Sequence, residues 1–372
     1  MKLAVNTLVV CVAALLSLGM VMLYSSSMTQ VGARYLIMQL VWCGLGLVAG
    51  AAAALVDYRK LKKVALPLLA LAVLLLVLVL VPGIGRRING ARRWFDFGGI
   101  RFQASELAKF ALLVAVAWYG DKFQRRMPNI REGILVPAAF IGLTLILIFV
   151  EPDRGTTILL AAVSAGMLLL AGVRWKFFVP PVVIGVVGLT VSILNDPMRM
   201  KRIFGWLNLE ETKSGVGYQA YQAMLALGAG GWSGLGLGAS RQKLGFVPEH
   251  HTDFILSIIG EELGLVATLA VVVAFVILVI CGLHIARHAS DTFGFLLAAG
   301  ITFLIGLQAC INIGVVTSAL PNKGLPLPFI SYGGSNLLMM LTCVGVLVSI
   351  ARHARPFVPT RSGGTGDFPN SR

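Results

Sequence analysis

Charged side chains are scarce in this sequence. Asp, Glu, Lys and Arg make up only 13% of the 372 residues, whereas hydrophobic residues make up 57%. A soluble protein of this length could not cover so much apolar surface with so few polar side chains. The composition therefore excludes a soluble globular protein. The long apolar runs are instead typical of membrane-spanning helices, because a span needs about 20 apolar residues and must satisfy its own backbone groups.

Cysteine is also rare, and its positions exclude two kinds of site. All five cysteines fall within apolar runs and lack the paired spacing of a disulfide framework or a zinc site; they are Cys11, Cys43, Cys281, Cys310 and Cys343. We interpret them as small core residues. His250 and His251 are adjacent rather than four residues apart, so they do not form a two-histidine zinc motif.

Acidic residues are outnumbered by basic ones, 16 against 31, which gives a net charge of +15. In a soluble protein this excess would suggest a nucleic-acid partner. Here much of it lies in short loops between apolar runs, where cations set the orientation of a membrane protein. No nucleic-acid-binding motif accompanies the charge, so we expect a membrane and no nucleic acid as partner.

The apolar runs predict an all-α, polytopic membrane protein with about ten transmembrane helices within residues 1–350. A long external loop, residues 195–253, separates helices seven and eight, and a Gly-, Ser- and Pro-rich tail, residues 351–372, is predicted to be cytoplasmic and disordered. The ten predicted helices are Leu3–Tyr24, Tyr35–Val56, Val64–Val81, Ser105–Tyr119, Ile134–Val150, Thr156–Gly172, Phe177–Leu194, Phe254–Leu283, Phe293–Leu320 and Ser335–Ile350.

An even number of spans places both termini on one side of the membrane, and the basic loops identify that side as the cytoplasm. This side holds the tail and residues 57–63, 120–132, 174–176 and 284–292. The external side holds residues 82–103, 151–155, 195–253 and 321–334.

Arginine is frequent in the external loop 82–103, against the tendency of cations to stay in the cytoplasm. This loop contains Arg86, Arg87, Arg92, Arg93 and Arg101. One interpretation is that a strong overall bias tolerates such exceptions. The other is that external cations bind an anion, for which a phosphate-bearing lipid is the obvious candidate.

Asp253 lies where the polar segment 195–249 meets a long apolar run. An ionisable group at the mouth of a membrane helix is costly to desolvate, so it is a functional hypothesis by default. The alternative is that Thr252 or Asp253 is an N-cap that accepts hydrogen bonds from free backbone amides.

Glu106 and Lys109 are three residues apart at the start of the fourth predicted helix, so they share one helical face. They form either a structural ion pair between helices or part of a charged cavity. Arg101 lies eight residues before Lys109, about two turns if the helix begins early, so both cations could face the same cavity.

Three further segments contain features that could belong to a site. Glu151, Asp153 and Arg154 form either a solvated, capped turn or part of the site. The glycine-rich stretch 227–238 has neither a preceding strand nor an acidic ribose partner, so we interpret it as a flexible or close-packed loop and not a dinucleotide site. In residues 324–335, prolines and glycines bracket apolar residues, which predicts buried non-helical backbone that forms a groove wall.

Four segments together resemble the SEDS family, which includes FtsW and RodA. They are residues 89–110 (NGARRWFDFGGIRFQASELAKF), 151–157 (EPDRGTT), 248–264 (PEHHTDFILSIIGEELG) and 321–336 (PNKGLPLPFISYGGSN). The resemblance covers nearly the whole chain in order. Residues 239–249 and the opening Glu151 are more similar to the FtsW branch than to the RodA branch.

This resemblance implies a peptidoglycan glycosyltransferase that polymerises lipid II on the external face of the bacterial cytoplasmic (inner) membrane, at the septum during cell division. It implies as partners a class B penicillin-binding protein, which crosslinks the strands, and other division proteins. The essential acidic residue of the family falls on Asp253, and its essential basic residues fall on Arg101 and Lys109. Further substrate-binding positions fall on Glu106, Glu249 and His251.

The chemistry of the reaction agrees with these residues. A base must take the proton of a sugar 4-hydroxyl, and positive charge must stabilise the departing diphosphate. Asp253 is the carboxylate placed for the first role; Arg101 and Lys109, or a divalent cation such as Mg or Mn, suit the second. One base and no general acid predicts a single inversion at the donor sugar.

Two other classes of function stay open at this point. A lipid II flippase should contain internal repeats and charged groups near the midplane, whereas these charges cluster at the external ends. A non-catalytic division scaffold should tolerate the change of Asp253 to Asn, whereas an enzyme should not.

Overall fold

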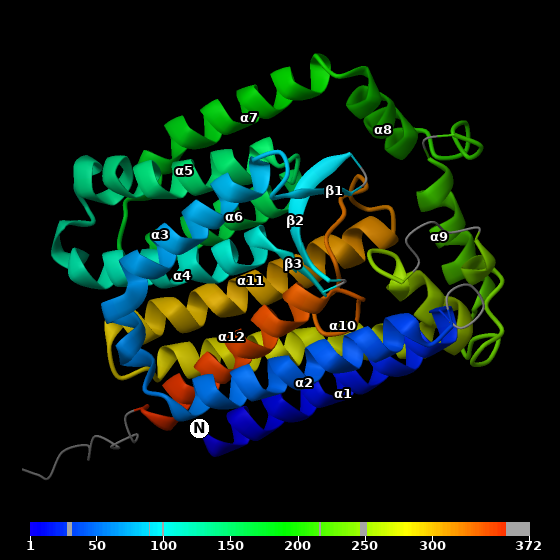
Figure 1. Ribbon diagram of the computed structural model, residues 1–372, viewed down its shortest axis with the longest axis horizontal. Coiled ribbons are helices and arrows are strands. Elements are labelled where there is room, and N and C mark those ends of the chain that lie inside the picture. The colour runs from blue at the N-terminus through cyan, green and yellow to red at the C-terminus, as the bar shows by residue number, and fades with distance from the viewer. Residues whose placement is uncertain (28–31, 89, 99, 216, 246–250, 355–372) are drawn as a thin grey trace, which may run out of the picture.

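The computed structural model describes residues 1–354 except for 28–31, 89, 99, 216 and 246–250. Its helices run side by side in one bundle (Figure 1). Every predicted span contains a helix. These helices are α1 Lys2–Ser27, α2 Arg34–Leu55, α3 Leu61–Leu80, α4 Ala104–Lys122, α5 Val136–Val150, α6 Arg154–Leu170, α7 Val179–Leu194, α10 Ile255–Arg287, α11 Thr292–Val316 and α12 Gly334–Arg352.

Within the described residues, eight helices are long and apolar enough to cross a membrane. The helical membrane fold class is therefore confirmed. α6 has 17 residues and falls short by length. α4 has 19 residues but carries four charged side chains, Glu106, Lys109, Asp121 and Lys122. The total of ten spans stays a prediction for this reason.

The core of the bundle is formed around α4 and α11, which are buried along most of their length. α12 packs against α2, and α10 packs against α1 and α11. α1 and α2 lie at one edge of the bundle and α7 at the other, at the bottom and top of Figure 1. α12 ends at Arg352, two residues into the predicted tail, and residues 355–372 lie outside the described part of the chain.

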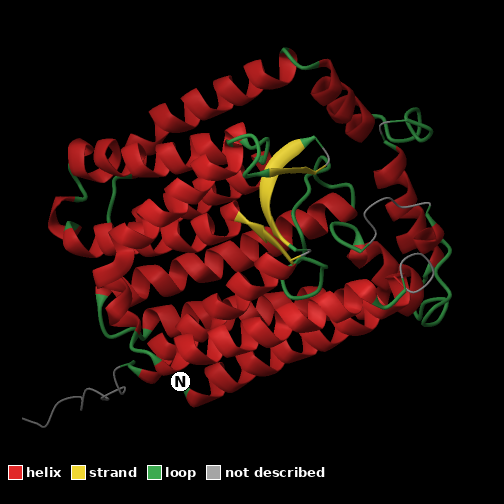
Figure 2. Ribbon diagram, viewed as in Figure 1, coloured by secondary structure: helices red, strands yellow, loops and turns green. Residues whose placement is uncertain are grey.

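Residues 82–103, which we predicted to be a loop, contain a small antiparallel sheet (Figure 2). Its strands are β1 Arg86–Ile88, β2 Ala91–Phe97 and β3 Ile100–Gln103, in the order β1-β2-β3. β3 leads directly into α4 at Ala104. The sequence contains a signal for the first hairpin, since Asn89-Gly90 is a favoured two-residue turn between strands.

Residues 195–253 are also more regular than a loop. They contain α8 Pro197–Leu207 and α9 Tyr218–Ala229. The glycine-rich residues after α9 pack closely against α10, because a β-carbon added to Gly234 would overlap the backbone of Glu262. Short 3-10 or π turns complete the fold: Tyr58–Lys60, Gln124–Arg126, Arg131–Leu135, Trp175–Phe178 and Gln242–Leu244.

Candidate active site

Asp253 lies just before α10, and its side chain is half-buried. The N-cap of α10 is Phe254, which makes no side-chain cap hydrogen bond, and the alternative that Thr252 or Asp253 binds free amides of this helix stays a prediction. The carboxylate is close to the backbone of Gly324: a β-carbon added there would lie 3.0 Å from Oδ2 of Asp253. A side chain at position 324 would therefore press on the carboxylate.

The backbone that carries Asp253 is held from two sides. Three successive carbonyls accept hydrogen bonds: that of His251 from the Tyr332 N–H at 3.0 Å, that of Thr252 from the Ser331 hydroxyl at 2.6 Å, and that of Asp253 from the Asn312 amide at 2.8 Å. Asn312 belongs to α11, whereas the other two donors belong to residues 321–333, which we name the proline-rich segment. These bonds fix the position of the backbone from which the side chain of Asp253 extends.

The proline-rich segment is non-helical and largely buried, as predicted. Its carbonyl groups are paired with side chains of the bundle. Gln308 donates to the Pro326 carbonyl at 2.9 Å, Asn312 to that of Leu325 at 2.7 Å, and Gln39 to that of Ser331 at 3.1 Å. The segment is therefore a rigid wall beside Asp253.

Glu106 and Lys109 form a buried ion pair at 2.8 Å, and their side chains are 4% and 2% exposed. Lys109 also donates to Gln308 at 3.2 Å, and Asn336 donates to Glu106 at 3.1 Å. The pair thus joins α4 to α11 and α12, as in the structural alternative. Direct contact with a substrate would require both side chains to leave this network.

Arg101 lies on β3 and α4 begins only at Ala104, so the early start of the helix on which we based a shared cavity is not observed. That Arg101 and Lys109 face one cavity stays a prediction. Its side chain is 53% exposed and its Nε is 3.9 Å from Oδ2 of Asp96. Burial raises the pKa of Tyr332, and the positive charge of Arg101 partly opposes this rise. Arg101 is thus an exposed cation on a strand that reaches the start of α12, because the Gln103 N–H donates to the Ser335 hydroxyl at 3.3 Å.

His251 stacks on Tyr35, with ring centroids 4.7 Å apart and an interplanar angle of 21°. Its ring also lies 5.9 Å from that of Tyr332. The imidazole is therefore held between aromatic rings two residues from Asp253. Glu249 and its neighbour His250 lie outside the described residues, so the predicted role of Glu249 in substrate binding stays a prediction.

The turn between α5 and α6 is capped, and its two carboxylates are buried although Pro152 is exposed. Asp153 accepts from the Thr156 N–H at 3.0 Å and caps α6. Glu151, however, is fully buried. Arg93 of β2 donates to the carbonyls of Glu151 at 2.7 Å and Pro152 at 2.9 Å, which ties the sheet to this turn.

Sequence reasoning missed two adjacent buried carboxylates, Glu261 and Glu262 of α10. Glu262 forms an ion pair with Lys243 at 2.9 Å and accepts from the Ser25 hydroxyl at 2.7 Å and the Gly238 N–H at 3.0 Å. Glu261 accepts from Ser240 and from the Arg241 N–H at 3.0 Å. The available signal was two adjacent carboxylates inside an apolar run.

In the described part of the chain, no three His, Cys, Asp or Glu side chains come together to hold a metal ion. Mg²⁺ is often bound through one carboxylate and the phosphates of a substrate, so Asp253 is compatible with such a site. The predicted divalent cation stays a prediction.

A family model described as cell cycle protein, of the FtsW, RodA and SpoVE type, matches residues 6–356. The probable peptidoglycan glycosyltransferase FtsW of Trichlorobacter lovleyi is 41% identical over 350 residues, which cover 92% of each chain.

Two solved structures are also similar to this chain. A chain from a structure of a peptidoglycan synthase complex, described as coordinating polymerization and crosslinking, has a TM-score of 0.79 and 29% identity over 93% of this chain and 96% of that one. The rod shape determining protein RodA of Thermus thermophilus has a TM-score of 0.71 and 28% identity over 94% of this chain and 97% of that one.

Proposed function

The chain belongs to the SEDS family of cell cycle proteins that includes FtsW, RodA and SpoVE, and we propose that it polymerises lipid II with Asp253 as the general base. Peptidoglycan glycosyltransferase activity is the function named for its FtsW relatives. The observation that supports the role of Asp253 is its half-buried carboxylate on a backbone held by Asn312 and the proline-rich segment.

Asp253 accepts the proton of the acceptor sugar 4-hydroxyl in this mechanism. The hydroxyl oxygen attacks the anomeric carbon of the donor sugar, and the bond from that carbon to the diphosphate oxygen breaks. The lipid diphosphate leaves with the electron pair of that bond and needs no proton. The rate depends on the orientation of the base. The hydrogen bonds to the three carbonyls of residues 251–253 hold the backbone of Asp253 and so maintain this orientation.

The leaving diphosphate requires positive charge. Arg101 is an exposed cation on β3, and its guanidinium can bind two phosphate oxygens at once. Lys109 is buried and paired in this structure, so we propose that it acts mainly by positioning: through Gln308 it supports the carbonyl of Pro326. Glu106, as its ion-pair partner, offsets the cost of burying the charge of Lys109. His251 presents its stacked ring to the sugar.

We further propose that the protein acts at the division septum in complex with a class B penicillin-binding protein. The related solved chain comes from a complex described as coordinating polymerization with crosslinking. Polymerised strands must be crosslinked, so the two activities belong in one assembly.

The test is polymerisation of labelled lipid II by the purified chain, with and without its penicillin-binding partner. Asp253→Asn should lower the rate by about 10²–10⁴-fold, the usual contribution of a positioned base. Asp253→Glu should recover little, because one extra methylene moves the carboxylate out of position. The backbone bond from Asn312 is unchanged in both variants, so folding and insertion should be preserved.

Glu210→Gln is the matched control, since Glu210 is an exposed carboxylate on the same long segment. It should retain the wild-type rate. Glycan synthesis by Asp253→Asn within a few-fold of wild type would rule out Asp253 as the base. Wild-type protein that binds lipid II but never polymerises it, even with its partner, would favour a flippase or scaffold instead.

A further inference from the structure

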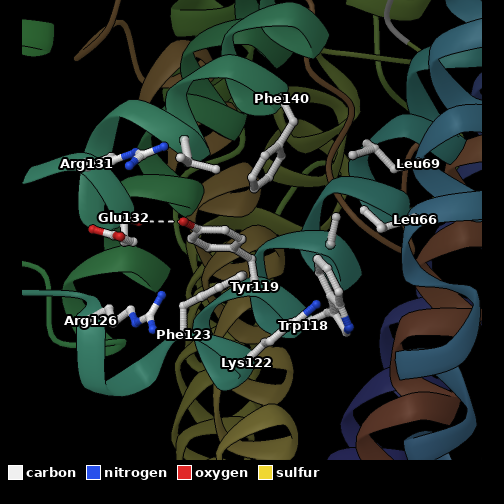
Figure 3. Close-up of a pocket in the computed structure, with 12 residues that line it drawn as sticks. Leu66, Leu69, Trp118, Tyr119, Lys122, Phe123, Arg126, Arg131, Glu132 and Phe140 are labelled. Carbon is white, nitrogen blue, oxygen red and sulfur yellow. Dashed lines mark hydrogen bonds between the residues drawn. The ribbon is translucent and has the colours of Figure 1, made fainter. Parts of the chain in front are cut away.

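A cavity of about 460 Å³ lies between α3, α4 and α5 (Figure 3). It is near the end of α4, whereas Lys109 is near the start of this helix. We name it the α3–α5 cavity. Much of its wall is apolar or aromatic: Leu66, Leu69, Ala115, Trp118, Tyr119, Phe123, Val136 and Phe140. Leu66 and Val136 are exposed on the surfaces of two apolar spans, so the cavity opens towards lipid chains rather than towards a soluble domain.

Three cations surround one side of this cavity. Lys122 is in the last turn of α4, Arg126 is in the following 3-10 turn, and Arg131 begins the π turn before α5. With Glu132 as the acidic lining residue, the charge of the lining is 3 − 1 = +2. Among the described residues, neither Arg126 nor Arg131 has an ion-pair partner. Their charges are therefore available to an anion.

The cavity is held in shape by internal contacts. The Tyr119 hydroxyl donates to the Glu132 carbonyl at 2.8 Å, which fixes the turn that carries Arg131 against α4. The ammonium of Lys122 lies 4.9 Å from the ring centroid of Trp118 and 5.4 Å from that of Phe123. This contact holds the Lys122 cation at the edge of the apolar wall.

From these observations we propose that the α3–α5 cavity binds the phosphate headgroup of an anionic glycerophospholipid. Arg126 and Arg131 pair with the headgroup phosphate, and an acyl chain lies along the wall formed by Leu66, Val136 and Phe140. A lipid fits better than free phosphate, because inorganic phosphate gains nothing from an apolar wall. This site is independent of the proposed glycosyl transfer, since it lies at the far end of α4.

The test is native mass spectrometry of the purified full chain with dioleoylphosphatidylglycerol or dioleoylphosphatidylcholine at equal concentrations. We expect at least one phosphatidylglycerol to bind about tenfold more tightly than phosphatidylcholine. Arg126→Gln and Arg131→Gln should each weaken phosphatidylglycerol binding about five-fold, as expected for one cation near a phosphate surface. Both side chains are exposed, so neither variant should affect folding.

Arg125→Gln is the matched control: it removes the same charge from the same turn, but Arg125 does not line the cavity. It should bind phosphatidylglycerol as wild type does. Leu66→Trp keeps the charge and fills the wall, and should also weaken binding. Equal affinity for the two lipids, an equal loss in Arg125→Gln, or displacement by inorganic phosphate or undecaprenyl phosphate at equimolar concentration would overturn the proposal.

Discussion

Glu151 is a buried carboxyl group whose two oxygens have no hydrogen-bond partner among the described residues. Burial, and then the charge of Asp153, raise its pKa from 4.5 to about 8, although Arg93 partly opposes the shift. Because the folded-state pKa is above the ordinary value, Glu151 is mainly neutral at pH 7. Its favourable contribution to folding is complete below pH 4.5 and is lost as the pH rises to about 8.

Glu151→Gln should therefore stabilise the protein in a pH-dependent way. At pH 5 the variant and wild type should unfold at similar temperatures, because both side chains are then mainly neutral. At pH 9 the variant should be more stable, by on the order of 2–4 kcal/mol, because the buried charge is removed. Thermal unfolding in detergent at both pH values measures the difference.

The exposed Glu211 offers a control at the residue scale, since Glu211→Gln should show no such dependence on pH. A stability difference between Glu151→Gln and wild type that is the same at pH 5 and pH 9 would contradict the raised pKa.

Residue types alone predicted only part of the candidate site. Asp253 was identified because an ionisable residue at a helix mouth is conspicuous against apolar sequence. The partners that hold it, Asn312 and Ser331, are ordinary polar residues, and only the folded arrangement of α11 and the proline-rich segment brings them to it. Lys109 was recognised as one member of a pair, but its burial depends on helices that are distant in sequence.

At the scale of elements, α10 is broken at Gly264, which has φ 78° and ψ −173°, a conformation open essentially to glycine alone. The break frees backbone groups that a continuous helix would pair internally. Residues 231–236 satisfy them: Leu235 and Gly236 donate to the carbonyls of Glu261 and Glu262, and Leu265 and Val266 donate to those of Gly231 and Trp232, at 2.9–3.3 Å. The break in α10 and residues 231–236 are therefore joined into one hydrogen-bonded unit.

Gly264→Ala should destabilise this structure. The new β-carbon would require a strained backbone and would lie 2.5 Å from the Trp232 carbonyl oxygen, so we expect a loss of about 3 kcal/mol or more. The apparent unfolding temperature in detergent should fall, and lipid II polymerisation should fall with it.

Gly142→Ala in α5 is the comparison, because a β-carbon there would meet no atom within 4 Å. It should leave both measurements near wild type. If Gly264→Ala matched Gly142→Ala, the break in α10 would not depend on glycine.

Apolar length predicted the ten long helices, since a bilayer requires a similar length of each span, although eight of them are long and apolar enough to cross a membrane within the described residues. The sheet of residues 86–103 was missed because its strands are short and arginine-rich, although the Asn89-Gly90 turn was visible. α8 and α9 were missed because a polar segment between spans is easily taken for a loop. The break at Gly264 was missed because the apolar run resumes after it, although Glu261, Glu262 and Gly264 itself interrupt the run.

For the whole molecule, the predicted topology places Ser214 outside the cell and Arg125 inside, and both residues are exposed in the structure. In a chain whose five native cysteines are replaced, a membrane-impermeant maleimide should label Ser214→Cys on intact cells. It should label Arg125→Cys only after permeabilisation. Labelling of Arg125→Cys on intact cells would contradict the orientation, and failure to label it after permeabilisation would show that the residue is inaccessible.

The bonds that α10 shares with residues 231–236 also determine how this region can move. The loop cannot open without unpairing the broken helix, so the two form a single cooperative unit of local unfolding. The first half of that helix begins two residues after Asp253, and Trp232 in the loop is 73% exposed. Holding this loop in place therefore also holds the first half of α10, which follows directly on the segment that carries Asp253.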